Sequence, residues 1–236
     1  MSDIWTMMWK ESKDLLFQGG WRSLIRPLIV VGVIGIYLPL QLGHQWVALT
    51  PISMLLLLWI PFFLIISFIG DAIAGERERH TLETLLASRM PDRAILLGKI
   101  VATVLYAWGM GILSLLLGLV LVDLLRTQGN WMFYPLDLFV DAIVLILLAS
   151  VLAASAGVLI SMIVSTVRQA QQILSVGTIV LVFGIIFVLQ ALPANFVSSL
   201  TYQQFLLIAM AFLAVLDAIL LVLSLMSFKR SRLILS

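Results

Sequence analysis

The sequence has few residues that react, bind metals or carry charge. It contains no cysteine, which excludes disulfides and thiolate metal sites. Its two histidines, His44 and His80, share no metal-ligand spacing. Only 11% of the residues are charged, against about a quarter in soluble domains. Because 62% of the residues are hydrophobic, polar groups cannot cover the surface, and part of the solvent must be lipid.

Hydrophobic segments divide the chain into spans. No Asp, Glu, Lys or Arg occurs between Pro27 and Gly70, and the polar stretch 41–46 splits that run into two crossings. The whole pattern predicts an all-α integral membrane protein with six transmembrane helices in a single domain over residues 1–236. We expect a loop at 123–135 and a short turn at Arg168–Gln172. The predicted spans are 25–42, 51–74, 95–122, 138–166, 172–191 and 204–227.

The start of the chain lacks the basic-then-apolar pattern of a cleaved signal peptide, so we expect insertion through internal segments. Residues 3–18 instead predict an amphipathic helix, with Trp5 and Trp9 on its apolar side and Lys10, Glu11 and Lys13 on the other. Tryptophan suits the headgroup level, which indicates a helix lying on the membrane and in contact with lipid. The alternative is an ordinary amphipathic helix packed on protein.

The basic residues gather on one side of the predicted membrane. With six spans, thirteen of the fourteen Lys and Arg residues fall on one side and Arg126 alone on the other. Basic loops are cytoplasmic, so we expect both termini in the cytoplasm of a multi-pass plasma-membrane protein. Since these residues stand at segment ends, their pattern indicates topology and not nucleic-acid binding.

One block of charge interrupts the apolar chain. Residues 75–99 hold nine of the 26 charged residues. Within the block, Leu82, Leu85, Leu86 and Met90 recur on one face of a predicted helix from Thr81 to Met90. A short helix with an apolar ridge, fixed between two spans, suits docking of a cytoplasmic partner. The alternative is a solvated loop that carries ordinary topology charges.

The block also resembles a known signature. Glu76-Arg-Glu-x-x-Thr-Leu-Glu-x-Leu-Leu86, followed by Gly98-Lys99, is similar to that of ABC-2 type exporter permeases, the six-helix membrane subunits of ATP-binding cassette transporters. The chain departs from that pattern at His80, where glycine is usual, and at Arg89, where proline is common. Both departures suggest a variant geometry of the coupling element.

The resemblance implies a function in transport. Segment 75–93 is then the cytoplasmic coupling segment that contacts a separate ATPase subunit, and a second permease subunit, identical or different, completes the exporter. This chain lacks G-x-x-x-x-G-K-[ST], so ATP and Mg are expected on the partner and no cofactor on this chain. The implied substrate is an amphipathic molecule such as a lipid, drug or peptide. The expected coupling residues are Glu76, Arg77, Glu78, Arg79, Thr81, Leu82, Glu83, Leu85 and Leu86.

Two further features lie within the predicted spans. Small residues at four-residue spacing in the fourth span predict close helix packing, either within the bundle or against a second subunit. Asp217 in the sixth span is a possible intramembrane polar site, as a substrate or proton site or as a hydrogen-bond acceptor for a Ser or Thr, and we favour the structural role. The small residues are Ala149, Ala153, Gly157, Ser161 and Ser165.

Other functions fit the sequence less well. An intramembrane enzyme needs paired ionisable groups or a histidine cluster within the bilayer, and Asp217 is the one deep carboxylate. An ion-coupled secondary transporter or a channel is the alternative we retain. Such proteins usually carry several buried charges or matching broken helices in two halves, and we find no internal repeat.

Overall fold

The structure is a computed structural model that describes residues 2–17, 21–69, 74–78, 91–126, 132–191 and 201–227. These ranges are mostly helical and contain no strand. Helix α1 covers Ser2–Phe17. A continuous helical run follows, made of α2 (Trp21–Val30), the π-helical η1 (Val31–Tyr37) and α3 (Leu38–Leu42). The other elements are α4 (His44–Val47), α5 (Pro51–Ile69), α6 (Glu76–Glu78), α8 (Asp92–Arg126), α9 (Leu136–Ile163), α10 (Val167–Ala191) and α12 (Tyr202–Ser227).

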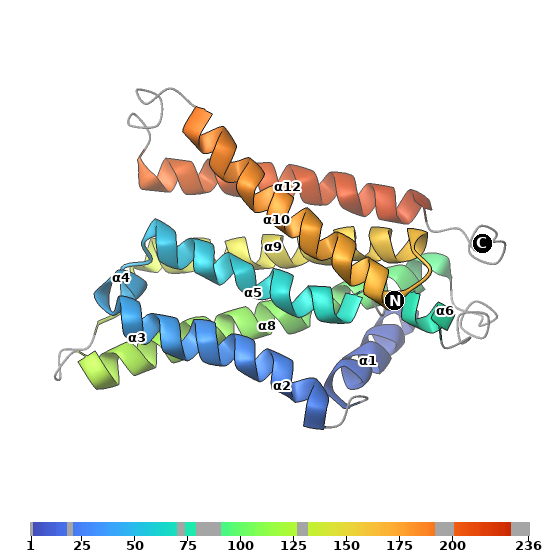
Figure 1. Cartoon of the computed structure of the whole chain (residues 1–236), viewed down its shortest axis with the longest axis horizontal. Coiled ribbons are helices and arrows are strands. Elements are labelled where there is room, and N and C mark those ends of the chain that lie inside the picture. Colours follow the sequence, from blue (N-terminus) through green and yellow to red (C-terminus); the bar gives the residue numbers. More distant parts are fainter. Residues whose placement is uncertain are drawn as a thin grey trace.

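The long helices form an elongated bundle with two distinct ends (Figure 1). One end, called the α1 end below, holds α1, α6, the start of α8 and the end of α9. The opposite end, the α4 end, holds α4, the end of α8 and the starts of α9 and α12. Helix α8 lies in the middle, in contact with α1, η1, α3, α4, α5 and α9. The bundle therefore joins the α1 end to the α4 end through several parallel and antiparallel rods.

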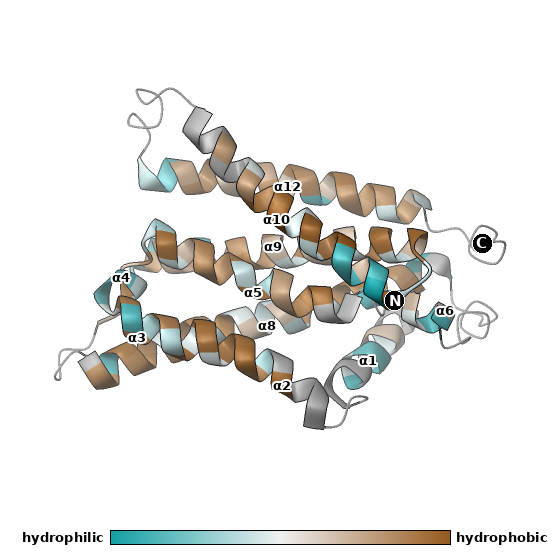
Figure 2. Cartoon of the chain, viewed as in Figure 1, coloured by the Kyte–Doolittle hydropathy of each residue, from teal (hydrophilic) through white to brown (hydrophobic). Residues whose placement is uncertain are grey.

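Hydropathy follows this arrangement. Hydrophobic residues cover the rods, whereas hydrophilic ones gather at α1, α6 and the first turns of α10, and at α4 (Figure 2). Among the described residues, three helices are long and apolar enough to cross a membrane: Arg93–Leu125, Leu136–Ile163 and Tyr202–Ser227. Two shorter apolar helices lie at Pro27–Leu42 and Pro51–Ile66. The chain is thus an all-helical membrane protein.

The break between the first two apolar segments has a local cause. Gly43 adopts φ 53°, a conformation that costs glycine little, and its amide donates to the carbonyl of Pro39 as the helix ends. Trp46 and Leu49 after the break are fully buried. The tight connection returns the chain into α5 at Pro51, where a proline is well tolerated at a helix start.

The turn predicted at Arg168–Gln172 is wrong. Those residues form the first turns of α10, and the break lies a few residues earlier, where Val164 is extended with φ −89° and ψ 154°. The hydroxyl of Thr166 accepts a hydrogen bond from the amide of Gln169 at 3.3 Å, as an N-cap does. Arg and Gln have good helix propensity, so polarity in this stretch did not mean a turn.

Candidate functional site

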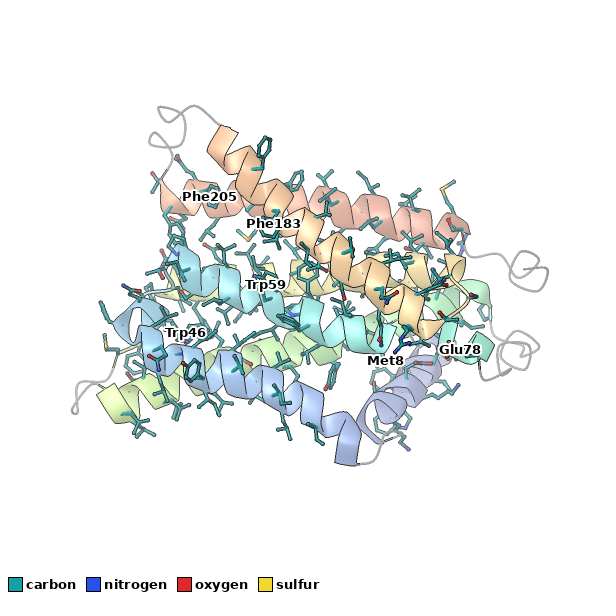
Figure 3. The ribbon with its side chains drawn as sticks, in the orientation of Figure 1. Met8, Trp46, Trp59, Glu78, Phe183 and Phe205 are labelled. Atoms are coloured by element: carbon teal, nitrogen blue, oxygen red, sulfur yellow. The ribbon has the colours of Figure 1, made fainter. Side chains whose placement is uncertain are left out.

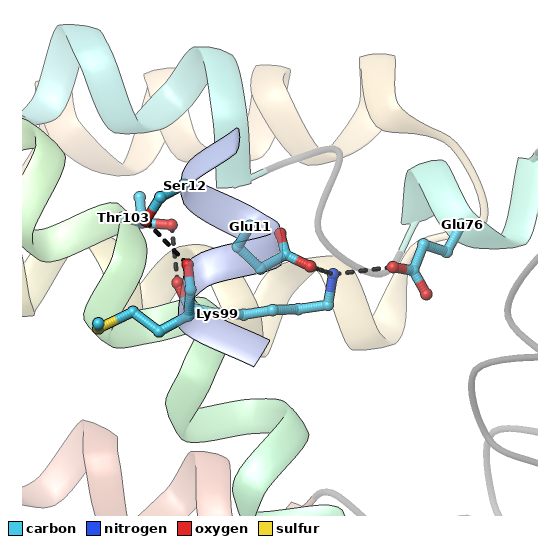
Figure 4. Close-up of polar contacts among 6 residues, drawn as sticks. Glu11, Ser12, Glu76, Lys99 and Thr103 are labelled. Atoms are coloured by element: carbon cyan, nitrogen blue, oxygen red, sulfur yellow. Dashed lines mark hydrogen bonds and ion pairs between the residues drawn. The ribbon is translucent and has the colours of Figure 1, made fainter. Parts of the chain in front are cut away.

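A buried ion-pair cluster joins three elements at the α1 end (Figure 4). The ammonium of Lys99 on α8 lies 2.8 Å from a carboxylate oxygen of Glu11 on α1 and 2.8 Å from one of Glu76 on α6. Lys99 is only 4% exposed, and both glutamates are largely buried. We call Glu11, Lys99 and Glu76 the inner triad. Because Glu76 opens the predicted coupling segment, the triad ties that segment to two helices.

Helix α1 approaches α8 closely beside the triad. A Cβ placed on Gly98 would lie 2.7 Å from Cβ of Met7, closer than real Cβ contacts permit. Met7 is fully buried and belongs to the same apolar cluster as Ile95 and Leu96. Gly98 therefore provides the space that lets α1 pack on α8.

This packing corrects one expectation for the N-terminal helix. Glu11 was placed on its solvent side, but its carboxylate turns toward Lys99 because burial of that ammonium requires a partner. Trp5 and Trp9 are both more than half exposed, and the ammonium of Lys13 lies 5.2 Å from the centre of the Trp9 ring. The helix thus packs on protein along one face and leaves its tryptophans outside.

A second contact connects the same segment to α10. The backbone amide of Val167, at the start of α10, donates to the carboxylate of Glu78 at 3.0 Å. Amides in the first turn of a helix lack intrahelical partners and sit at the positive end of the helix dipole, so an acidic acceptor is favourable there. Figure 3 shows Glu78 at the same end of the bundle as Met8 of α1. Together with the triad, this contact links α6 to α1, α8 and α10.

The rest of the predicted coupling segment is not covered. Arg79, Thr81, Leu82, Glu83, Leu85 and Leu86, with the departures at His80 and Arg89, lie outside the described residues. The backbone of Arg77 belongs to α6. Their expected roles therefore stay predictions, and what the structure adds is how the first residues of the segment are held.

Polar residues at the α4 end are held locally. The Tyr134 hydroxyl donates to the carbonyl of Leu115 at 2.8 Å, and a carboxylate oxygen of Asp123 accepts from the amide of Met132 at 3.1 Å. Burial raises the pKa of the Tyr134 phenol, so it remains a neutral donor. Asp123, placed in a loop by its polarity, is a buried residue of α8. These contacts fold the 132–135 stretch back onto α8.

The small residues of the fourth span face the interior of this chain. Ala149, Ala153, Gly157 and Ser161 are all buried, and Ser161 donates to the carbonyl of Val158 in its own helix. Their helix packs against α5, α8, α10 and α12. Ser165 lies beyond the end of α9, in an exposed bend.

Asp217 lies in the middle of α12 and is 4% exposed. Neither carboxylate oxygen has a hydrogen-bond partner among the described residues. The hydrogen bond to a Ser or Thr that the sequence favoured is therefore not formed in that part of the chain. A search of the same ranges finds no group of three or more His, Cys, Asp or Glu residues that could hold a metal.

The sequence reasoning missed the triad as a unit. Lys99 was counted as a topology charge and as part of a Gly-Lys pair, and Glu11 as a solvated residue. The two side chains are 88 residues apart, and no local periodicity relates them. The sequence did hold one sign of this contact: Lys99 lies seven residues after the start of α8 and follows the first apolar residues of that helix. A lysine at that depth predicts an acidic partner.

Comparison with known proteins gives a family match. The family model described as "ABC-2 family transporter protein" matches residues 46–226, which is most of the chain. A comparison with curated proteins finds no match. The matched range includes α6 and the triad residues Glu76 and Lys99, and excludes α1.

Proposed function

Since the chain belongs to the ABC-2 family of transporter proteins, we propose that it is the permease subunit of an ATP-driven exporter, working as a dimer with a separate ATPase. Membership makes the chain a membrane transport component and not itself a catalyst. ATP binding and hydrolysis, with the required Mg, are assigned to the partner because this sequence lacks a phosphate-binding loop.

The proposed topology has six crossings with both termini in the cytoplasm. The run from α2 to α3 and helices α5, α8, α9, α10 and α12 would be the spans. Successive spans run in opposite directions, and α2 begins and α12 ends at the α1 end (Figure 1), which supports an even number of crossings. The Lys and Arg residues of α1 and of the first turns of α8 and α10 lie at the α1 end, whereas Arg126 ends α8 at the α4 end, which supports placing the α1 end in the cytoplasm of a plasma-membrane protein.

The anchoring of α6 carries the proposal that segment 75–93 couples the ATPase to the membrane helices. Glu76 binds Lys99, which also binds Glu11, and Glu78 accepts from the start of α10. A displacement of the segment would therefore pull on α1, α8 and α10 together. Buried charge-assisted contacts suit such a link because breaking them is costly.

Helix α1 fits an interfacial position in this scheme. Its inner face is fixed to α8 by Met7 and Glu11, whereas Trp5 and Trp9 remain exposed. Exposed tryptophans next to lysine are typical of the headgroup level. We propose that α1 lies along the cytoplasmic membrane surface and contacts lipid through these two side chains.

The test is co-purification of an ATPase. The tagged chain, isolated from its native membrane, should carry a polypeptide with a phosphate-binding loop, and ATP hydrolysis should follow that polypeptide. Replacing Leu85 and Leu86 together by Asp should abolish co-purification, because the docking ridge becomes charged.

The matched control makes the same change at the opposite end of the molecule. Leu124 and Leu125 are 64% and 66% exposed at the end of α8, and their replacement by Asp should leave the complex intact. If the Leu85 and Leu86 variant retained the ATPase as well as this control does, the docking assignment would be wrong. If no ATPase accompanied the wild-type chain, the ion-coupled alternative would be preferred.

A further inference from the structure

Asp217 carries a buried carboxylate in the middle of α12. Both carboxylate oxygens are without a hydrogen-bond partner in the described part of the chain, and the side chain is almost fully buried. Leaving a buried carboxylate unmatched is costly in any protein and more so within a bilayer. The site therefore favours a group that brings N–H donors and positive charge.

Helix α9, on which α12 packs, offers hydrogen-bond acceptors near Asp217 and has no Lys or Arg. Leu213 packs on the apolar cluster that contains Leu145 and Ile146, and Leu221 packs on the cluster that contains Ala153 and Val158. Asp217 lies between those two levels, opposite the middle of α9, where small residues predominate. The serines of this region, Ser150 and Ser155, donate to carbonyls of their own helix, which leaves their oxygens as acceptors.

The interface between α9 and α12 can open without disturbing the packing of the other long helices. Within the described residues α12 packs mainly on α9, and it is the least buried of the three long apolar helices. Its other faces present exposed apolar residues such as Phe212, Val215 and Ile219. A ligand from the lipid could reach Asp217 by separating α12 from α9.

We propose that Asp217 binds the ammonium group of a hydrophobic amine that enters between α9 and α12. The inference rests on the proposed permease function and names the class of substrate as amphipathic primary amines. Ten residues separate Asp217 from the nearer end of α12, about 15 Å at the rise of an α-helix. A phospholipid headgroup stays at the surface, so the ligand is a mobile amine with an apolar body.

The test measures binding directly on the full chain. The chain is placed in phosphatidylcholine nanodiscs, whose lipid has no N–H donor, and saturable binding of radiolabelled dodecylamine is measured at neutral pH. Replacing Asp217 by Asn keeps the shape and removes the charge, and should weaken binding by about tenfold or more, the scale of a charged hydrogen bond. The control Asp137→Asn makes the same change at an exposed position and should bind as the wild type does.

Two outcomes would overturn the inference: no saturable binding by the wild-type chain, or equal binding by the wild type and Asp217→Asn. Should that variant fail to fold, competition on the wild type decides the matter. Unlabelled dodecylamine should displace the label, whereas equal displacement by dodecanol would refute recognition of the ammonium. The assay needs no ATPase, so its failure leaves the proposed function standing, and loss of the ATPase complex would not affect it.

Discussion

Removal of the lysine from the inner triad is the sharpest test of the site. In Lys99→Met, a side chain of similar length replaces the ammonium, and the carboxylates of Glu11 and Glu76 lose the cation that lies 2.8 Å from each. Removing one partner of a buried ion pair costs about 3–5 kcal/mol, because the remaining charge stays desolvated. In a chain of this size, each kcal/mol lowers the melting temperature by roughly 2–4 °C. The expected decrease is therefore about 6–20 °C.

Thermal unfolding in detergent micelles, followed by intrinsic tryptophan fluorescence, measures this decrease. The control is Lys10→Met, which makes the same substitution on the exposed side of α1 and should shift the melting temperature by no more than about 2 °C. Combining Lys99→Met with Glu11→Gln and Glu76→Gln removes all three charges and should recover most of the loss, since neutral replacement of a buried ion cluster is often tolerated. If Lys99→Met had the same melting temperature as Lys10→Met, the triad would not be a buried electrostatic link.

Two other substitutions test the packing around the site and at the far end. Gly98→Ala places a Cβ 2.7 Å from Cβ of Met7 and should destabilise the chain by about 1–3 kcal/mol. Gly109→Ala lies on the same helix with nothing within 4 Å of the added Cβ and should stabilise the chain slightly. The melting temperature should therefore fall for Gly98→Ala and rise for Gly109→Ala. Tyr134→Phe removes the donor to Leu115 and should cost about 1–2 kcal/mol by the same measurement, and a neutral result would mean that this hydroxyl is satisfied by solvent.

The sequence predicted where the long helices lie but not where they begin and end. Hydropathy located the fourth span at 138–166, and α9 covers Leu136–Ile163. The third span was placed at 95–122, but α8 continues from Asp92 to Arg126, because hydropathy marks the apolar part of a helix and a helix does not stop where polarity begins. The π-helical winding of Val31–Tyr37 was not predicted from the sequence pattern.

Charges were the least predictable part of the site. The block at residues 75–99 stood out by composition, but composition could not tell which of its charges are solvated. Lys99 is buried because Glu11 and Glu76 converge on it from 88 and 23 residues away, and only tertiary structure brings these three together. The position of Asp217 deep in a span was evident from the sequence, but its lack of a hydrogen-bond partner among the described residues was not.

The inner triad also has a consequence for biogenesis. Glu11 and Glu76 are both synthesised before Lys99, so neither carboxylate can contact that ammonium until the start of α8 leaves the ribosome. Chains fold from the N-terminus as they emerge, and a contact that spans 88 residues is late by necessity. A nascent chain that stops before residue 99 therefore lacks the Lys99 ammonium, and the link between α1, α6 and α8 forms only after the start of α8 has been made.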